Sequence, residues 1–403
     1  MDLPGVPSAL LEDLRYAASE TGATRLALVG GVVRDGLLHR LHESPWRDTP
    51  DLDLVVEGDA SALAEALKKR CGPSRLTHCV QHGSFGTVAL TCDSLAVDLA
   101  TARSESYSAP GQNPVVTPGS LRADLVRRDF SINAMALDLV SGELLDFFGG
   151  QRHLAQHQLV FLHGSSVADD PTRVIRAARY GARLSFDLAN DALEQIRTTI
   201  ERWPWGWQLG DSPDQAPPAL ATRLRMELAR LLEHEPWQQA LDLLERWGAL
   251  GLIDPSLQLD RGRSRRLRWA HRLGLPLMPA LLSGAADSVQ TARRLQISGV
   301  QQQWLEQLPS LRIWLREEAP PAQAPPSQWT NALETGGWHP EVVGLLICEA
   351  PEQWRPLLRW WGRWRHQSSP VPAKDLIRSG WQPGPALGAE LQRLRLAELD
   401  QGR

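Results

Sequence analysis

The sequence has no long uninterrupted apolar run and few cysteines. None of its apolar stretches reaches about 18 residues, so we expect no transmembrane helix. The N-terminus lacks the basic region and apolar core of a secretory signal. The four cysteines form neither a CxxC pair nor a Cys/His metal spacing, which favours a reducing compartment over a disulfide framework. We therefore expect a cytoplasmic protein without a membrane partner.

The chain also lacks a strong net charge. The formal charge is −4 over 403 residues, which excludes a globally basic nucleic-acid-binding protein but not a local basic face. Arginine far outnumbers lysine, and 15 of the 16 tryptophans lie after residue 200. This shift in composition indicates that the two halves form separate domains.

The first 150 residues alternate helical and strand patterns. Residues 8–20 predict a helix capped by Ser8, and "RLALV" predicts a buried strand that ends in a Gly-Gly turn. Further expected elements are a helix at 32–41, strands at 51–58, 85–92 and 95–101, a helix at 60–72, a loop at 103–120, an apolar helix within "FSINAMAL" and a short strand or turn at 142–150.

Helical periodicity dominates after about residue 152. We expect helices at 171–184, 217–235 and 236–254, with proline-rich linkers or exposed loops at 211–218 and 319–326. The predicted fold class is α+β: a head with a mixed sheet and flanking helices, followed by an all-α remainder. The expected domains are a catalytic head at 1–150, a helical neck at 151–255 and a helical body and tail at 256–403.

The "DLDL" segment places two carboxylates on one side of a strand. Asp51 and Asp53 are two positions apart and therefore project together. Two like charges at this separation are costly unless a cation lies between them, and carboxylate oxygens suit Mg²⁺. Asp98, within "AVDLA", would add a third carboxylate from a neighbouring strand. An exposed edge strand with solvated aspartates would show the same pattern.

The "VGGVVRD" segment adds an anion-binding feature. Gly30 and Gly31 lie between a strand and a helix, where free backbone N–H groups can approach a phosphate. Arg34 offers a bidentate phosphate partner. A plain structural turn would look similar, but the glycines followed by Asp51 and Asp53 describe a site for a triphosphate and metal ions.

Five motifs occur in an order that resembles a known family. They are "GGVVRD", "DLDL", "FGTVAL", "RRDFSINAMALD" and "DDPTRVIRAARY". This order resembles the bacterial-type (class II) tRNA nucleotidyltransferase and poly(A) polymerase family, which includes CCA-adding enzymes and relatives that add only CC or only A. The resemblance covers roughly residues 24–255.

The resemblance implies roles for the "RRD" motif. Arg128 and Asp129 would hold the phosphates and ribose of the incoming nucleotide, and Asn133 would support the sugar. A carboxylate accepts hydrogen bonds from ribose hydroxyls, and Arg127 with Arg128 would offset phosphate charge. A simple ion pair at a helix start is the alternative.

The resemblance likewise implies that the fifth motif recognises the base. Asp170 and Arg173 match the family positions that hydrogen-bond the base edge and so replace a nucleic-acid template. Asp169 or Asp170 could instead only cap the helix that follows. Arg176 and Arg179 would contact phosphates.

The chain departs from the family pattern at three places. Asp169 stands where the full CCA-adding pattern has Glu, and Pro171 follows, which puts the accepted nucleotides in doubt. Residues 36–50 form a longer connection than is usual. The loop at 103–120 lies where the family has a flexible element that helps to switch from C to A, and shortened versions belong to CC-only enzymes.

The mechanism that the resemblance implies uses two Mg²⁺ ions held by Asp51 and Asp53. The tRNA 3′-hydroxyl would attack the α-phosphate of CTP or ATP, and pyrophosphate would leave. Positioning and charge stabilisation would supply most of the catalysis.

The helical remainder carries arginine-rich segments that suit an RNA backbone. The segment 261–272, "RGRSRRLRWAHR", includes Arg265 and Arg266, and the segment 354–366 includes Arg355 and Arg359. A solvated basic face over a tryptophan-filled core would show the same pattern.

Three rival functions remain open. A poly(A) polymerase would share nearly all the motifs, and a catalytically inactive RNA-binding relative would lack the intact aspartates. A small-molecule nucleotidyltransferase would share only the glycine and D-x-D elements. The expected function is template-independent addition of CMP and/or AMP to the 3′ end of tRNA.

Overall fold

The computed structural model describes residues 3–42, 44–46, 50–82 and 86–401. By its contacts the chain divides into two compact units. The first contains residues 1–208, 217–227 and 234–249, and the second contains 209–216, 228–233 and 250–403. Phe85 of the "FGTVAL" motif lies outside the described residues.

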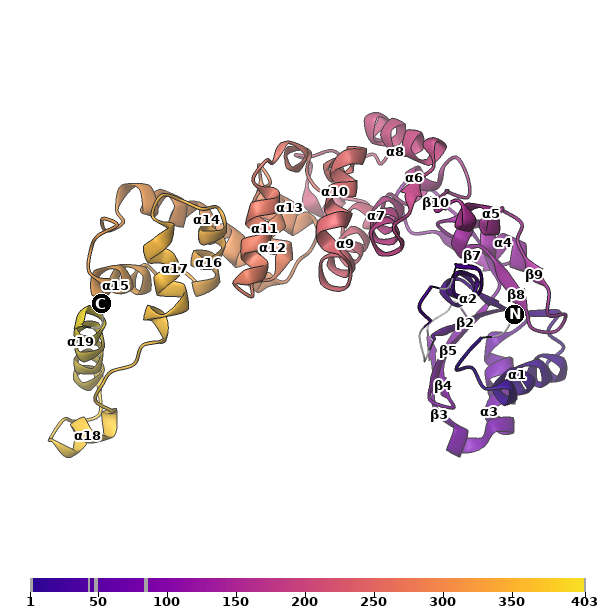
Figure 1. The fold of residues 1–403 in the computed structure, drawn as a ribbon, viewed down its shortest axis with the longest axis horizontal. Helices are drawn as coiled ribbons and strands as arrows, with labels where there is room; N and C mark the ends of the chain where they lie inside the picture. The colour runs from indigo at the N-terminus through magenta and orange to yellow at the C-terminus, as the bar shows by residue number, and fades with distance from the viewer. Residues whose placement is uncertain (1–2, 43, 47–49, 83–85, 402–403) are drawn as a thin grey trace. The chain divides into compact units, whose positions relative to one another are not determined.

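The first unit is built around a seven-stranded mixed sheet with the strand order β3-β4-β5-β2-β1-β8-β9. Strands β2 and β5 pair in parallel, and the other neighbours pair antiparallel. Helices α1 and α3 pack together beside the sheet (Figure 1). The elements up to the first short strand pair are α1 (Ser8–Glu20), β1 (Arg25–Val29), α2 (Gly31–His42), β2 (Leu52–Glu57), α3 (Ala60–Arg75), β3 (Leu76–His82), β4 (Thr87–Cys92), β5 (Leu95–Thr101), β6 (Arg103–Ser106) and β7 (Val115–Pro118).

Helices follow the sheet in the first unit, with one further short strand pair. Strands β10 and β11 pair in parallel at Gln158↔Asp187, a small exception to the all-α remainder. The remaining elements of this unit are α4 (Leu121–Val126), η2 (Ser131–Asn133), β8 (Ala136–Asp138), β9 (Leu144–Leu145), α5 (Gly150–Ala155), β10 (Gln158–Leu159), α6 (Ser166–Asp169), α7 (Thr172–Leu184), β11 (Asp187–Leu188), α8 (Asn190–Arg202), η4 (Pro218–Leu220), α9 (Thr222–His234) and α10 (Trp237–Trp247).

The second unit contains only helices among its described residues. Helices α12, α14 and α16 turn apolar stripes inward, so that side chains such as Leu281, Leu305 and Leu345 are buried. The helices of this unit are η3 (Pro213–Gln215), η5 (Ala249–Leu252), η6 (Pro255–Leu259), α11 (Arg263–Arg272), α12 (Leu277–Leu282), α13 (Ser288–Arg294), α14 (Gly299–Glu317), α15 (Pro326–Thr335), α16 (Pro340–Cys348), α17 (Trp354–Gly362), η7 (Trp364–His366), α18 (Ala373–Arg378) and α19 (Pro385–Gln401). No described helix has the length and hydropathy that a membrane crossing requires.

The predicted α+β class is confirmed, but three local predictions are wrong and one strand was missed. Ser8 does not cap α1, whose N-cap is Pro7 without a side-chain hydrogen bond. The expected loop at 103–120 contains the antiparallel pair β6–β7. The apolar segment after Asp129 is a 3₁₀ turn and strand β8 rather than a helix, because β8 pairs with β1 inside the sheet. Strand β3 was not predicted at all.

Candidate active site

The acidic residues lie on the central strands of the sheet. Asp53 of β2 pairs in register with Asp98 of β5. Burial raises the pKa of Asp53, the charges of Asp98 and Asp51 raise it further, and Arg128 lowers it. Asp51 immediately precedes β2 and is exposed. Asp98 and Asp51 therefore both lie close enough to Asp53 for their charges to act on it.

These carboxylates are not arranged as a preformed metal-binding site. Among the described residues, no group of three or more His, Cys, Asp or Glu side chains is close enough to hold a metal ion. Asp51, Asp53 and Asp98 would have to reorient to share a cation. Their role as metal ligands stays a prediction.

The Gly-Gly turn faces this acidic group. Gly30 has φ +72°, a left-handed conformation that glycine adopts without strain. A Cβ atom at this position would lie 3.2 Å from Arg128 Nη1 and 3.4 Å from Asp53 Oδ2. Helix α2 begins at the next residue, Gly31. The turn thus brings an arginine and an aspartate close to the N–H groups that open a helix.

Asp129 is the centre of a buried polar network. Its Oδ1 accepts from Phe130 N at 2.8 Å and from Asn133 Nδ2 at 3.0 Å. Its Oδ2 lies 2.7 Å from Arg176 Nη2. Burial alone would raise the pKa of Asp129, but Arg176 and these hydrogen bonds hold it below its ordinary value. Asp129 is therefore a fixed, ionised acceptor.

The network continues to the start of α2. Arg34 is buried, and its Nη1 donates to Asn133 Oδ1 at 2.7 Å. Its Nε donates to Asp35 Oδ1 at 2.8 Å, and its guanidinium lies over the Tyr180 ring. Arg34, Asn133, Asp129 and Arg176 thus form one connected chain of contacts.

The two arginines of the "RRD" motif have acidic partners. Arg127 pairs with Asp124 Oδ1 at 2.7 Å and with Glu105 Oε1 at 2.9 Å. Arg128 Nη2 lies 3.1 Å from Asp124 Oδ2. Asp124 is fully buried and contacts both guanidinium groups, so it fixes their orientation.

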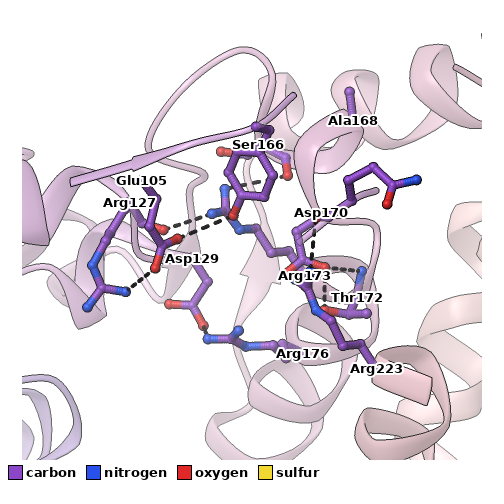
Figure 2. A network of polar contacts seen from close by, with 12 residues as sticks. Glu105, Arg127, Asp129, Ser166, Ala168, Asp170, Thr172, Arg173, Arg176 and Arg223 are labelled. Carbon is purple, nitrogen blue, oxygen red and sulfur yellow. Dashed lines mark hydrogen bonds and ion pairs between the residues drawn. The ribbon is translucent and has the colours of Figure 1, made fainter. Parts of the chain in front are cut away.

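The predicted base-binding pair is held by residues outside its motif. Arg173 Nη2 donates to Arg127 O at 2.8 Å (Figure 2). Its Nη1 donates to His163 Nε2 at 3.2 Å. Asp170 accepts from Thr172 and pairs with Arg223, which lies on α9. Asp170 Oδ1 also accepts a hydrogen bond from the backbone N–H of Thr172, the first residue of α7, as the side chain of an N-cap residue does. Both side chains are buried.

Arg179 is occupied by carboxylates within the same unit. It pairs with Glu227 and with Glu235, and Arg183 pairs with the same Glu235. A phosphate contact by Arg179 would have to replace one of these carboxylates. Its nucleotide-binding role stays a prediction.

A cavity of about 730 Å³ opens beside the catalytic candidates. Asp51, Asp53 and Arg34 line it together with Tyr180 of α7. Trp46, from the longer connection at 36–50, lines the same cavity. This connection therefore contributes to the walls of the candidate site.

The predicted RNA-binding arginines differ in exposure. Arg265, Arg355 and Arg359 are exposed. Arg266 is buried, and its guanidinium binds Asp260 Oδ2 at 2.5 Å and Ala280 O at 2.7 Å. Arg266 thus faces the interior of the second unit, which corrects its expected place on an RNA-facing surface.

Sequence reasoning missed several residues of this site. Arg223, His163 and Glu105 all contact predicted site residues. They lie 53, 10 and 22 residues from their respective partners Asp170, Arg173 and Arg127, and none belongs to one of the five motifs. Only Glu105 lies in a segment that the sequence singled out, the loop at 103–120.

The chain is similar in sequence to known proteins. The family profile described as Poly A polymerase head domain matches residues 26–160. The CC-adding tRNA nucleotidyltransferase of Deinococcus radiodurans is 33% identical over 396 residues, which cover 96% of this chain and 87% of that protein. The A-adding tRNA nucleotidyltransferase of Aquifex aeolicus is 41% identical over 179 residues, but these cover 44% of this chain and 20% of that protein.

Solved structures share the fold along nearly the whole chain. A CCA-adding enzyme in its apo form II has a TM-score of 0.73 at 24% identity, with 98% of this chain and 93% of that chain covered. The Thermotoga maritima CCA-adding enzyme complexed with tRNA has a TM-score of 0.68 at 23% identity, with 98% and 92% covered. These matches establish the fold.

The sheet, the glycine turn and the paired aspartates define an enzyme of the nucleotidyltransferase class. The similarity to the Deinococcus enzyme extends over nearly the whole chain and therefore identifies a particular family within this class. The chain belongs to the tRNA nucleotidyltransferase and poly(A) polymerase family.

Proposed function

We propose that this chain is a tRNA nucleotidyltransferase that adds CMP and/or AMP from CTP or ATP to the 3′ end of tRNA without a nucleic-acid template. The observation that carries the proposal is the pairing of Asp53 with Asp98 beside the Gly30 turn. The near-full-length CC-adding relative and the shorter A-adding match support the choice of substrates.

The donor set suits a divalent cation. Mg²⁺ takes oxygen ligands. Although Arg128 acts to lower the pKa of Asp53, burial and the charges of Asp98 and Asp51 raise it overall. Asp51, Asp53 and Asp98 would hold two such ions. When bound, they would lower the pKa of the attacking 3′-hydroxyl and bind the triphosphate.

The other residues of the site bind and orient the nucleotide. The N–H groups at the start of α2 and the guanidinium of Arg128 face the triphosphate. Asp129 and Asn133 accept and donate hydrogen bonds at the ribose. Because this network is already ordered, little reorganisation is needed when the nucleotide binds.

The base contacts and the RNA acceptor complete the proposal. Asp170 accepts from the exocyclic amine of the base, and Arg173 donates to its ring acceptors. Arg265, Arg355 and Arg359 contact the tRNA backbone. The protein would act in the cytoplasm, where its tRNA substrate is found.

The test is incubation of the purified chain with Mg²⁺ and tRNA transcripts that end before CCA, after C or after CC. CTP and ATP are offered separately and together, and products are sized to single nucleotides. Growth to CCA followed by arrest identifies a full CCA-adding enzyme, and arrest after CC identifies a partial one. No incorporation by a folded protein that binds tRNA contradicts the proposal.

Asp53→Asn provides the matched control for this test. The substitution removes a catalytic carboxylate and keeps the side-chain volume. We expect incorporation to fall by about 1,000-fold or more, with an unchanged circular dichroism spectrum. Omission of Mg²⁺ should have the same effect on the native chain.

Poly(A) polymerase activity is the second candidate, because the matched family profile describes the head of that enzyme. It predicts unlimited addition of A to RNAs unrelated to tRNA. The same gel separates this outcome from the length-limited products of a tRNA enzyme.

A further inference from the structure

The guanidinium of Arg223 joins two parts of the candidate base site (Figure 2). It pairs with Asp170 Oδ2, and its Nη1 donates to Gln112 O at 3.4 Å. Arg223 lies on α9, whereas Gln112 lies between β6 and β7. One side chain therefore connects the predicted base acceptor with the segment 103–120.

Asp170 has little freedom to rotate. Its Oδ1 accepts from Thr172 Oγ1 at 2.6 Å and from Thr172 N at 3.1 Å. Its Oδ2 accepts from Arg223. An ionised carboxylate has about four acceptor positions, so roughly one remains for a ligand. A turn of the carboxylate would break hydrogen bonds to Thr172 and a charge-assisted contact with Arg223.

Arg173 is fixed in the same way. It donates to Arg127 O, to His163 Nε2 and, at 3.4 Å, to Ser166 O. A guanidinium has five N–H groups, which leaves about two for a ligand. The site therefore offers one acceptor and two donors in a fixed arrangement.

The segment 103–120 is hydrogen-bonded to the backbone next to Asp170. Gly111 N donates to Asp169 O at 3.2 Å, and Ala219 N donates to Gly111 O at 3.1 Å. Gly111 has φ +77°, and a Cβ there would lie 2.9 Å from Trp205 Cδ1. The segment thus rests closely against the residues that precede α7 and α9.

Tyr107 completes the attachment of this segment. Its hydroxyl donates to Glu105 Oε2 at 3.4 Å, and Glu105 in turn pairs with Arg127. Burial raises the pKa of Tyr107 to about 12, so the phenol stays protonated and able to donate. The segment is therefore attached both through Arg223 and through Glu105.

We infer that Arg223 is a specificity-determining positioning residue, which holds Asp170 in one orientation so that the site accepts cytosine and disfavours adenine. The inference rests on the proposed function, because it concerns the choice between CTP and ATP in the same site. Cytosine presents an amine and two acceptors, N3 and O2, on its pairing edge. Adenine presents an amine and one acceptor, N1, on a larger ring system. One acceptor and two donors held at a fixed separation match cytosine.

The test measures the equilibrium binding of CTP and of ATP by calorimetry with Mg²⁺ and without tRNA. The same proteins are then assayed for single-nucleotide addition to tRNA. Arg223→Ala removes both contacts, and Arg223→Lys keeps one charged contact with Asp170. Arg197→Ala, on the exposed face of α8, is the control for loss of one arginine.

We expect the native chain to bind CTP more tightly than ATP. Arg223→Ala should lower the CTP-to-ATP ratio of kcat/KM by about tenfold or more, mainly through a higher KM for CTP. Arg223→Lys should recover part of the ratio, and Arg197→Ala should keep all of it. A purely structural role would lower thermal stability and both activities together, without a change in the ratio.

Two results would overturn the inference. One is equal affinity of the native chain for CTP and ATP, and the other is an unchanged CTP-to-ATP ratio in a folded Arg223→Ala variant. Failure of the proposed function has a different signature. A native chain that binds CTP selectively but extends no tRNA contradicts the function, while the binding ratios still decide the role of Arg223.

Discussion

Helices α7 and α11 are both rich in arginine but use these side chains in different ways. On α7, Arg176 lies against Asp129, and both Arg179 and Arg183 pair with Glu235. On α11, Arg266 turns inward onto Asp260, whereas Arg265 is exposed. The spacing of arginines along a helix shows which of them share a face. Carboxylates from distant segments decide whether that face is internal.

This difference separates two roles of arginine. On α7, buried acids hold guanidinium groups beside the proposed nucleotide site. On α11, Arg263 and Arg266 are buried, and Arg266 ties neighbouring helices together, whereas Arg265 is exposed and can meet a partner such as RNA. The following predictions test this division, beginning with the largest effect.

Removal of the carboxylate of Asp129, which contacts Arg176 of α7, should have the largest effect. Asp129→Asn leaves Arg176 without its buried counter-charge and removes the predicted ribose acceptor. We expect kcat/KM for nucleotide addition to fall on the order of 100-fold, and the free energy of unfolding to fall by about 3 kcal/mol. Single-nucleotide addition and urea unfolding measure the two quantities. Asp187→Asn, at an exposed position, should change neither, and full activity of Asp129→Asn contradicts the proposed ribose contact.

Arg266, one of the two buried arginines of α11, should affect stability but not RNA binding. Arg266→Ala removes contacts with Asp260 and with two backbone carbonyls. We expect the free energy of unfolding to fall by about 3 kcal/mol, while tRNA affinity stays unchanged in the folded state. Arg265→Ala should show the reverse, with a change of at most about 0.5 kcal/mol in stability. Urea unfolding and filter binding of tRNA check the pair, and a loss of affinity confined to Arg266→Ala would break the comparison.

Glu235 should make the α7 contacts dependent on pH. Burial acts to raise its pKa, but Arg183 and Arg179 hold the pKa below the ordinary 4.5. A depressed pKa adds stability that is present above about pH 4.5 and is lost as the pH falls through the folded-state value. Glu235→Gln should therefore lower the free energy of unfolding by about 2 kcal/mol at pH 7, with a smaller difference at pH 4. A difference that is constant between pH 7 and pH 4 contradicts the ion-pair explanation.

The exposed arginines of α17 should have the smallest effect on the isolated protein. Arg355→Ala with Arg359→Ala should leave the melting temperature unchanged and weaken tRNA binding. Each lost phosphate contact should reduce the slope of log affinity against log salt by about 1. Binding titrations over a range of salt concentrations measure this slope. An unchanged slope indicates that the RNA lies elsewhere on the second unit.

Local patterns predicted the elements that carry the motifs. The apolar run before Gly30 and the alternation around Asp53 gave β1 and β2 within about a residue of their ends. Helix α7 begins at Thr172, close to the predicted start at Pro171. These elements were predictable because their signals are the glycine turn, the strand alternation and the helical period, all of which act over a few residues.

Elements defined by distant partners were not predictable in this way. The segment "NAMAL" has an apolar run that suits either a helix or a buried strand, and its pairing with β1 decides for β8. Strand β3 forms only against β4, and β6 only against β7. The fold class was nevertheless predicted correctly, because the alternating patterns of the first 150 residues and the helical periodicity after about residue 152 are local signals.

The sequence by itself determined the chemistry of this protein: the aspartates at 51, 53 and 98, the glycine turn, and the arginines and acids of the later motifs. Only the tertiary structure decided which partners these side chains have. It joined Asp170 to Arg223, Arg176 to Asp129 and Arg266 to Asp260. The reason is physical, since a buried charge must find its counter-charge in space, and the chain can supply that partner from any segment.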